Sequence, residues 1–138
     1  MAVERQIEVP AQPEYLQDLR QVAKAAAEAY GFDKDSVRDL VLAVNEACMN
    51  VIQHGYAGRS GPIGLEVVSL PNGIEFRISD AADPIALSAW QARDLNDIRP
   101  GGLGVHFIRE IMDEVCYLPT PDNTGNLLSL KKYRPGQG

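Results

Sequence analysis

Three polar side chains at four-residue spacing lie within an apolar helical pattern in the segment LVLAVNEACMNVIQHGY, residues 40–56. A step of four residues is slightly more than one helical turn, so Glu46, Asn50 and His54 project from nearly the same face of a helix. The other side carries an apolar stripe that predicts packing against a sheet or other helices: Val37, Leu40, Val41, Val44, Cys48, Val51 and Ile52. We expect Asp33 or Asp35 to cap the start of this helix and Gly55 to end it. The polar face is then either a solvated flank or a functional surface.

Length and composition predict one globular domain spanning residues 1–138, because 45% of the residues are hydrophobic and 23% are charged. The sequence has no apolar run of membrane-spanning length, and its first residues, MAVERQIEVP, include charges where a signal peptide has an apolar core. We therefore expect a cytoplasmic protein without a membrane partner. Cys48 and Cys116 have no metal-ligand spacing and apolar neighbours, which predicts two buried, reduced thiols.

The charge balance argues against direct binding of nucleic acid. Lys and Arg total 13 against 19 Asp and Glu, so the formal net charge is -6, and no basic cluster is longer than Lys131-Lys132. A single small polyanion is a different case, since backbone amides at a helix N-terminus bind phosphate without net positive charge.

Periodicity and turn signals predict the order strand, two helices, hairpin, long connection, helix, strand. The expected elements are a strand over 3–9, helices over 14–30 and up to residue 55, strands over 65–70 and 74–79, a helix over 103–115 and a strand over 126–133. Pro71-Asn72-Gly73 is a hairpin turn, and the connection between residues 81 and 102 is long enough to be a functional lid. This order indicates an α+β fold in which helices cover a mixed, mostly antiparallel sheet.

Two further motifs lie downstream of the long helix. Asp80 ends a strand, where a carboxylate either projects into a crevice or serves as a turn residue. Gly101, Gly102 and Gly104 close the long connection, while Leu103 and Val105 begin an apolar helix. Such a glycine-rich helix start lets backbone approach closely and aims free N–H groups at a phosphate, although a flexible hinge has the same composition.

Taken in order, the three motifs resemble the N, G1 and G2 boxes of the GHKL ATPase superfamily. Within it, the phrases NEACMNVIQHGY and GGLGVHFIREIMDEV are most similar to the anti-sigma factor serine kinases, the RsbW-like group. The resemblance spans nearly the whole chain. It implies a two-layer α/β sandwich of the histidine-kinase-like, or Bergerat, type with helices on one face of the sheet.

The resemblance also implies roles and cofactors, namely ATP and Mg²⁺. Asn50 would give its amide oxygen to Mg²⁺, a cation that prefers oxygen ligands, and Glu46 would be the general base. Asp80 would accept a hydrogen bond from the adenine amino group, with Asn126 supporting the adenine side. The glycine-rich segment 101–105 would wrap the phosphates.

One position departs from the family pattern. Relatives commonly have Asp-x-Gly after the G1 strand, whereas this chain has Asp80-Ala81-Ala82. If the backbone there needs a positive φ, alanine costs on the order of 1 kcal/mol; otherwise it is accepted.

Three hypotheses follow from these motifs. The leading one is a Mg-ATP-dependent kinase that phosphorylates a serine on an antagonist (anti-anti-sigma) protein and so regulates transcription. The second, motivated by Ala82, is a non-catalytic or weakly ATP-binding module that sequesters a sigma factor or another partner. The third is the ATP-binding half of a split histidine kinase. The resemblance further implies that two copies of the chain can pair.

Overall fold

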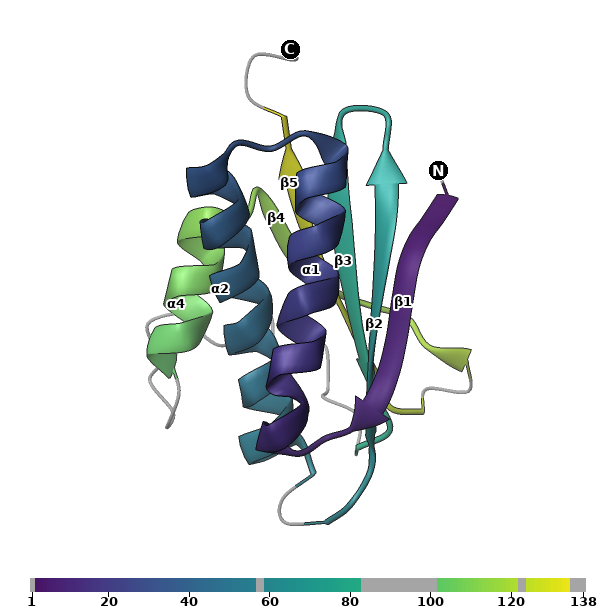
Figure 1. Cartoon of the computed structure of the whole chain (residues 1–138). Coiled ribbons are helices and arrows are strands. Elements are labelled where there is room, and N and C mark those ends of the chain that lie inside the picture. The colour runs from purple at the N-terminus through teal and green to yellow at the C-terminus, as the bar shows by residue number, and fades with distance from the viewer. Residues whose placement is uncertain (1, 57–58, 83–101, 122–123, 135–138) are drawn as a thin grey trace.

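The computed structural model describes residues 2–56, 59–82, 102–121 and 124–134 (Figure 1). Its elements are β1 (Ala2–Pro10), a short 3-10 helix η1 (Pro13–Tyr15), α1 (Leu16–Tyr30), α2 (Lys34–Asn50), a π-helical turn η2 (Val51–Gly55), β2 (Pro62–Leu70), β3 (Gly73–Asp80), α4 (Gly102–Ile111), β4 (Glu114–Leu118) and β5 (Asn126–Tyr133). The predicted connection over residues 81–102, including its expected helical turn around residues 88–93, lies almost entirely outside the described residues.

The five described strands form one sheet in the order β1-β2-β3-β5-β4. The predicted mostly antiparallel sheet is confirmed, and all four pairings are antiparallel. The predicted edge strand, hairpin and last strand are β1, the β2–β3 pair and β5. The last strand inserts between β3 and β4, so residues far apart in sequence become neighbours, as in the pairing of Asp80 with Asn126.

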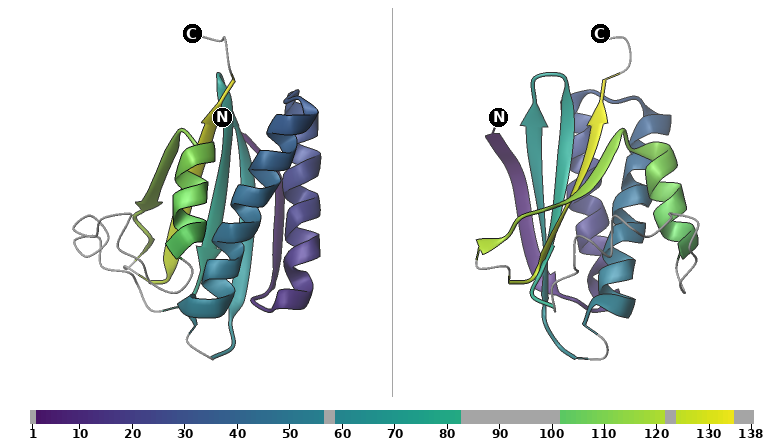
Figure 2. Two further views of the ribbon diagram at one scale, coloured as in Figure 1. Left: turned by 90° about the vertical axis from the view of Figure 1, so that its left-hand side faces the viewer. Right: turned by 180° about the vertical axis from the view of Figure 1, so that it is seen from behind.

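The described helices α1, α2 and α4 lie on one face of this sheet (Figures 1 and 2). In β3, Ile74, Phe76 and Ile78 alternate toward the helices and are almost fully buried, as period-2 patterning requires. The helices contribute small and branched side chains to this core: Leu19, Ala23, Ala26 and Ala27 from α1, and Val37, Leu40, Ala43, Val44, Ala47 and Cys48 from α2. The predicted two-layer α+β architecture is therefore confirmed.

The connection between α1 and α2 explains where each helix ends. Gly31 has φ 108° and its N–H donates to the carbonyls of Ala27 and Glu28, which is a left-handed C-cap. Of the two predicted N-cap residues, Asp33 caps α2, because its side chain accepts a 2.8 Å hydrogen bond from the Ser36 N–H.

The predicted helix over 103–115 is wrong at its C-terminal end. α4 stops at Ile111, whose carbonyl accepts a 2.8 Å hydrogen bond from Lys132 Nζ, and β4 begins at Glu114. Val115 continues the helical spacing of Ile111 in the sequence, but it pairs with Leu130 in the sheet instead. The prediction for Cys116 is also wrong, because β4 exposes this thiol, whereas Cys48 is fully buried.

The face of the sheet opposite the helices is charged. Glu75 is 2% exposed there, accepts a 2.5 Å hydrogen bond from Ser129 Oγ, and forms a 3.2 Å ion pair with Arg77. Across the strands, Arg77 is flanked by Glu66 on β2, which pairs with Gln6 on β1. None of the described helices is both long and apolar enough to cross a membrane.

Candidate functional site

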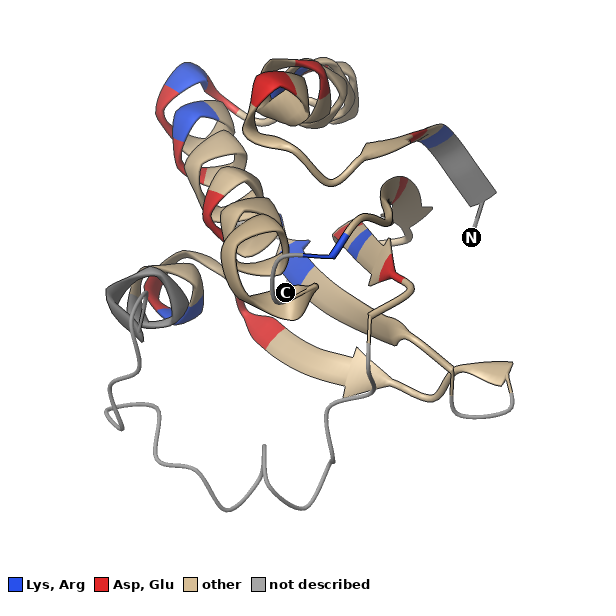
Figure 3. Ribbon diagram, turned by 90° about the horizontal axis from the view of Figure 1, so that it is seen from below, with Lys and Arg blue, Asp and Glu red and all other residues tan. Residues whose placement is uncertain are grey.

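Four elements converge at the lower end of the molecule in Figure 1. β3 ends there at Asp80, β5 begins there at Asn126, α2 ends there at Asn50, and α4 begins there at Gly102. This end is viewed directly in Figure 3, which also shows Lys and Arg interspersed with Asp and Glu on the outer surfaces of α1 and α2. The sequence motifs are therefore brought to one end of the sheet by the antiparallel arrangement of the strands.

Asp80 is held by two hydrogen bonds to the same carboxylate oxygen. Its Oδ1 accepts from the Ala82 N–H at 2.9 Å and from Asn126 Nδ2 at 3.0 Å. Asn126 is 8% exposed and lies directly opposite Asp80 in the β3–β5 register. Asp80 shares the helix-facing side of the sheet with Ile78 because the two residues are two positions apart on one strand.

Ala82 occupies a buried position in the turn that follows Asp80. Only 3% of the residue is exposed, and its methyl lies near Gly55, where an added Cβ would be 3.9 Å from the Ala82 Cβ. Its N–H is satisfied by the Asp80 carboxylate. The methyl therefore packs against the π-helical turn.

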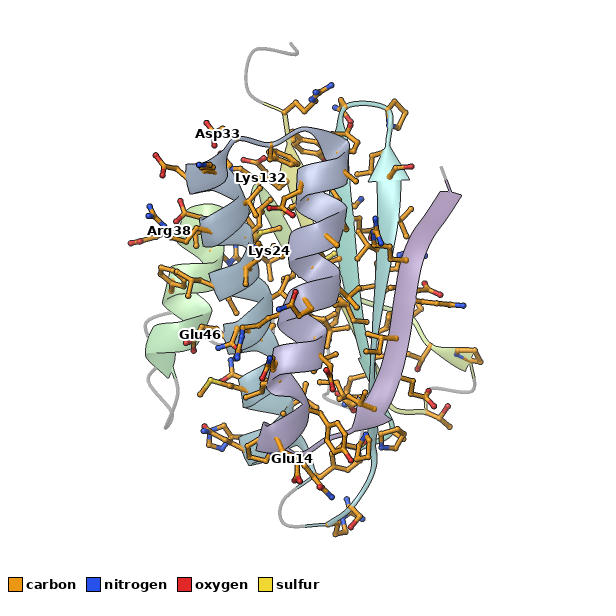
Figure 4. The ribbon with its side chains drawn as sticks, in the orientation of Figure 1. Glu14, Lys24, Asp33, Arg38, Glu46 and Lys132 are labelled. Atoms are coloured by element: carbon orange, nitrogen blue, oxygen red, sulfur yellow. The ribbon has the colours of Figure 1, made fainter. Side chains whose placement is uncertain are left out.

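α2 supplies Glu46 and Asn50, both half-buried, and Glu46 lies on the side of α2 nearest α4 (Figure 4). Beyond Asn50 the helix widens into the π-helical turn, in which His54 is exposed. Among the described residues no group of three or more His, Cys, Asp and Glu side chains gathers as a metal site. The amide oxygen of Asn50 fits Mg²⁺, which keeps several waters and is commonly bound through few protein oxygens together with substrate phosphates.

The first turn of α4 contains Gly102, Leu103, Gly104 and Val105, while Gly101 lies outside the described residues. The N-terminal N–H groups of a helix have no intrahelical acceptor, so this turn can donate to an anion. Trp90, Arg93 and Arg99, which belong to the connection predicted to be a lid, also lie outside the described part of the chain.

Comparison with known proteins places the chain in a family. The model of the histidine kinase-like ATPase domain family matches residues 9–132. The chain belongs to this family. The serine-protein kinase RsbW of Bacillus subtilis (strain 168) is 30% identical to it, with 96% of this chain and 86% of the relative covered. The serine-protein kinase RsbW of Halalkalibacterium halodurans is 27% identical, with 91% and 80% covered. The predicted membership of the RsbW-like group is thus confirmed.

A solved structure supports the fold alone. The histidine kinase domain of a blue-light activated histidine kinase from Erythrobacter litoralis has a TM-score of 0.55 and 17% sequence identity. The match covers 91% of this chain, which spans 61% of that structure's chain.

Tyr56 lies beside this candidate site, next to the Asp80 turn, and motif reasoning missed it. The residue is 5% exposed, and its hydroxyl donates to the Pro62 carbonyl at 2.5 Å and accepts from the Ala81 N–H at 2.7 Å. Burial raises the pKa of the Tyr56 phenol, and the nearby Asp80 and Glu8 carboxylates raise it further, against a lowering by the Ala81 hydrogen bond. Its sequence signal is a lone aromatic residue at the start of a glycine-rich loop.

Gly125 was also missed. It has φ 66°, and a Cβ at this position would lie 2.2 Å from the Asp80 carbonyl oxygen. The backbone before Asn126 therefore approaches the end of β3 more closely than any side chain permits.

Proposed function

We propose that the chain is a cytoplasmic, Mg-ATP-dependent protein serine kinase of the anti-sigma type, formed by a single domain over residues 1–138. The observation that carries the proposal is the Asp80–Asn126–Ala82 cluster, located where α2 ends and α4 begins in an ATPase-family fold. The names of the relatives support serine as the acceptor.

Different residues serve nucleotide binding, metal binding and proton transfer in the proposed reaction. Asp80 accepts a hydrogen bond from the adenine amino group, with Asn126 fixing its carboxylate, and the first turn of α4 faces the phosphates. Asn50 offers an amide oxygen to Mg²⁺, which neutralises phosphate charge when bound. Glu46 takes the proton of the partner's serine hydroxyl as that oxygen bonds to the γ-phosphorus and ADP leaves.

Radiolabelled ATP and candidate antagonist proteins test this proposal. Glu46→Gln removes the base while keeping side-chain size, so phosphoserine formation should fall by about 10²- to 10⁴-fold. Glu28→Gln, on the exposed surface of α1, is the matched control and should keep the wild-type rate. Full activity of Glu46→Gln would contradict the assignment, and phosphohistidine in place of phosphoserine would favour the split histidine kinase.

The second candidate is a regulatory module that sequesters a sigma factor with weak or no ATP binding. Buried Ala82, at the position where relatives commonly have glycine, is the observation that favours it. Calorimetry separates the two candidates. Micromolar Mg-ATP binding that Asn50→Ala abolishes supports the kinase, whereas a folded protein without detectable binding supports the module.

The proposed partners are an antagonist protein, a sigma factor and a second copy of the chain. The surface proposed for pairing is the sheet face opposite the helices, where a hollow of about 530 Å³ is lined by residues that include Gln6, Glu8, Glu66 and Arg77. Its side chains carry both charges, so two such faces can complement each other. A single species of monomer mass in sedimentation equilibrium across the micromolar range would argue against this pairing.

A further inference from the structure

The Tyr56 hydroxyl joins three segments that are separate in the sequence. The residue follows the π-helical turn at the end of α2, donates to Pro62 at the start of β2, and accepts from Ala81 just after β3. The ring packs so closely on Gly61 that an added Cβ there would lie 2.1 Å from it. Both hydrogen-bonding capacities of the phenol are therefore used inside a packed site.

The N–H that Tyr56 accepts belongs to the peptide group between Asp80 and Ala81. The carbonyl of the same planar group faces Gly125, where an added Cβ would come within 2.2 Å of it. This peptide is thus restrained on both sides, by a hydrogen bond to Tyr56 at its nitrogen and by close contact with Gly125 at its oxygen.

This peptide leads directly to Ala82, so its orientation sets where the Ala82 N–H lies. The Ala82 N–H and Asn126 on the adjacent strand are the two donors that hold the Asp80 carboxylate. Without the Tyr56 hydroxyl, the peptide between Asp80 and Ala81 would be freer to rotate. The geometry of the hydrogen bonds from Ala82 and Asn126 to the Asp80 carboxylate would then change.

We propose that Tyr56 is a positioning residue for Asp80 that determines discrimination between 6-amino and 6-oxo purine nucleotides. The inference rests on the proposed nucleotide site, in which Asp80 accepts from the 6-amino group. A buried acceptor discriminates strongly only when its oxygen is held in place, because a misdirected oxygen loses the hydrogen bond without losing the other contacts.

The test compares Tyr56→Phe with Tyr30→Phe by calorimetry with Mg-ATP and Mg-ITP. Tyr30 is a matched control because its hydroxyl also bonds to a backbone carbonyl, that of Leu70 at 2.9 Å, but at the opposite end of the sheet. We expect Tyr56→Phe to weaken ATP binding about tenfold and leave ITP binding nearly unchanged, so the ATP-to-ITP affinity ratio falls about tenfold. A general loss of structure would weaken both nucleotides alike. A wild-type ratio in Tyr56→Phe overturns the proposal.

A measurement without nucleotide separates this inference from the proposed function. In the wild-type protein the Ala81 amide should be protected from hydrogen exchange, and in Tyr56→Phe, but not Tyr30→Phe, the Ala81 amide and Asn126 side-chain amide resonances should shift. If the wild-type protein binds neither nucleotide but Tyr56→Phe still shifts these resonances, the nucleotide site is refuted. Tyr56 is then retained as the residue that positions Asp80. An unprotected Ala81 amide in the wild type refutes the positioning role whatever the variants do.

Discussion

Asp80 presents its two carboxylate oxygens to different surroundings. Oδ1 accepts from Ala82 and Asn126, and within the described parts of the chain no donor contacts Oδ2. A carboxylate held through one oxygen keeps the other for a ligand, and it accepts only from donors. In the proposed site, this asymmetry leaves one Asp80 oxygen to accept a hydrogen bond from the adenine amino group.

Asn126→Asp tests this arrangement, because it places a second carboxylate about 3 Å from Asp80 where an amide donor was. Like charges at this distance cannot both ionise without cost, so the folded state retains a proton that the unfolded chain releases near pH 4. Stability is therefore lost as pH rises from about 4 toward neutrality, by about 2 kcal/mol.

Urea unfolding at pH 4.5 and pH 7.5 measures this loss. Asn126→Ala is the control, since it removes the same hydrogen bond without adding charge and should lose similar stability at both values. An Asn126→Asp deficit that does not depend on pH would show that the side chains are not in contact.

The two cysteines differ in burial, since Cys48 lies in the core and Cys116 is exposed. Burial raises the pKa of the Cys48 thiol to about 12 from 9.0. The unfolded chain ionises this thiol above pH 9 while the fold keeps it neutral, so the free energy of unfolding should fall as pH rises from 9 toward 12. The loss is about 1.4 kcal/mol at pH 10.

Chemical denaturation at pH 8 and pH 10 measures this fall in the free energy of unfolding. The fall should be smaller in Cys48→Ala and unchanged in Cys116→Ala, because Cys116 is exposed. A thiol reagent should modify one cysteine, Cys116, in the native protein and both after unfolding. Reaction of two thiols in the folded protein would contradict the burial of Cys48.

At the scale of elements, the turn before β5 and the turn after α1 use glycine for different reasons. Both Gly125 and Gly31 have positive φ, so alanine strains either backbone by about 1 kcal/mol. At Gly31 the nearest obstacle is the end of the Arg134 side chain, whereas at Gly125 it is the Asp80 backbone.

We therefore expect Gly125→Ala to destabilise the protein by about 3 kcal/mol or more and to weaken ATP binding, because the β3 end must shift. Gly31→Ala, the control that also places alanine at a positive φ, should lose about 1 kcal/mol and bind ATP normally, since Arg134 can move aside. Thermal unfolding and calorimetry measure both effects, and equal losses in the two variants would refute the role of the Asp80 contact.

Elements that depend on local pattern were predictable, whereas those that depend on distant pairing were not. Asp33, Gly31 and the Pro71-Asn72-Gly73 turn act within a few residues, so their signals are visible in the sequence. β4 was missed because Val115 fits the helical period of α4 and becomes a strand residue only through β5.

The same limit applies to the site. Glu46, Asn50, Asp80 and Asn126 could be selected as candidates from motif and resemblance, but Tyr56 and Gly125 act on the backbone of Asp80 and Ala81 from distant segments. The surroundings of Ala82 could not be predicted from the sequence either, since only the structure shows its methyl near the π-helical turn.

At the scale of the whole molecule, nucleotide binding should stabilise the fold, because the proposed site is formed by the ends of four elements that separate on unfolding. Mg-ATP at a hundred times its dissociation constant should add about 2.7 kcal/mol to the free energy of unfolding. Differential scanning fluorimetry with and without EDTA measures the shift, and Asn50→Ala should lose its magnesium-dependent part. An identical melting temperature with and without saturating Mg-ATP would contradict the proposed site.

The position of β5 in the sheet has a consequence for synthesis of the chain. Translation delivers β3 before β4 and β4 before β5, yet β5 is the strand that lies between the other two. While the nascent chain still lacks β5, β4 has no neighbour in the sheet and Asp80 has no Asn126 opposite it. Because the Asp80–Asn126–Ala82 cluster forms only when β5 emerges from the ribosome, an incomplete chain would lack the proposed nucleotide site.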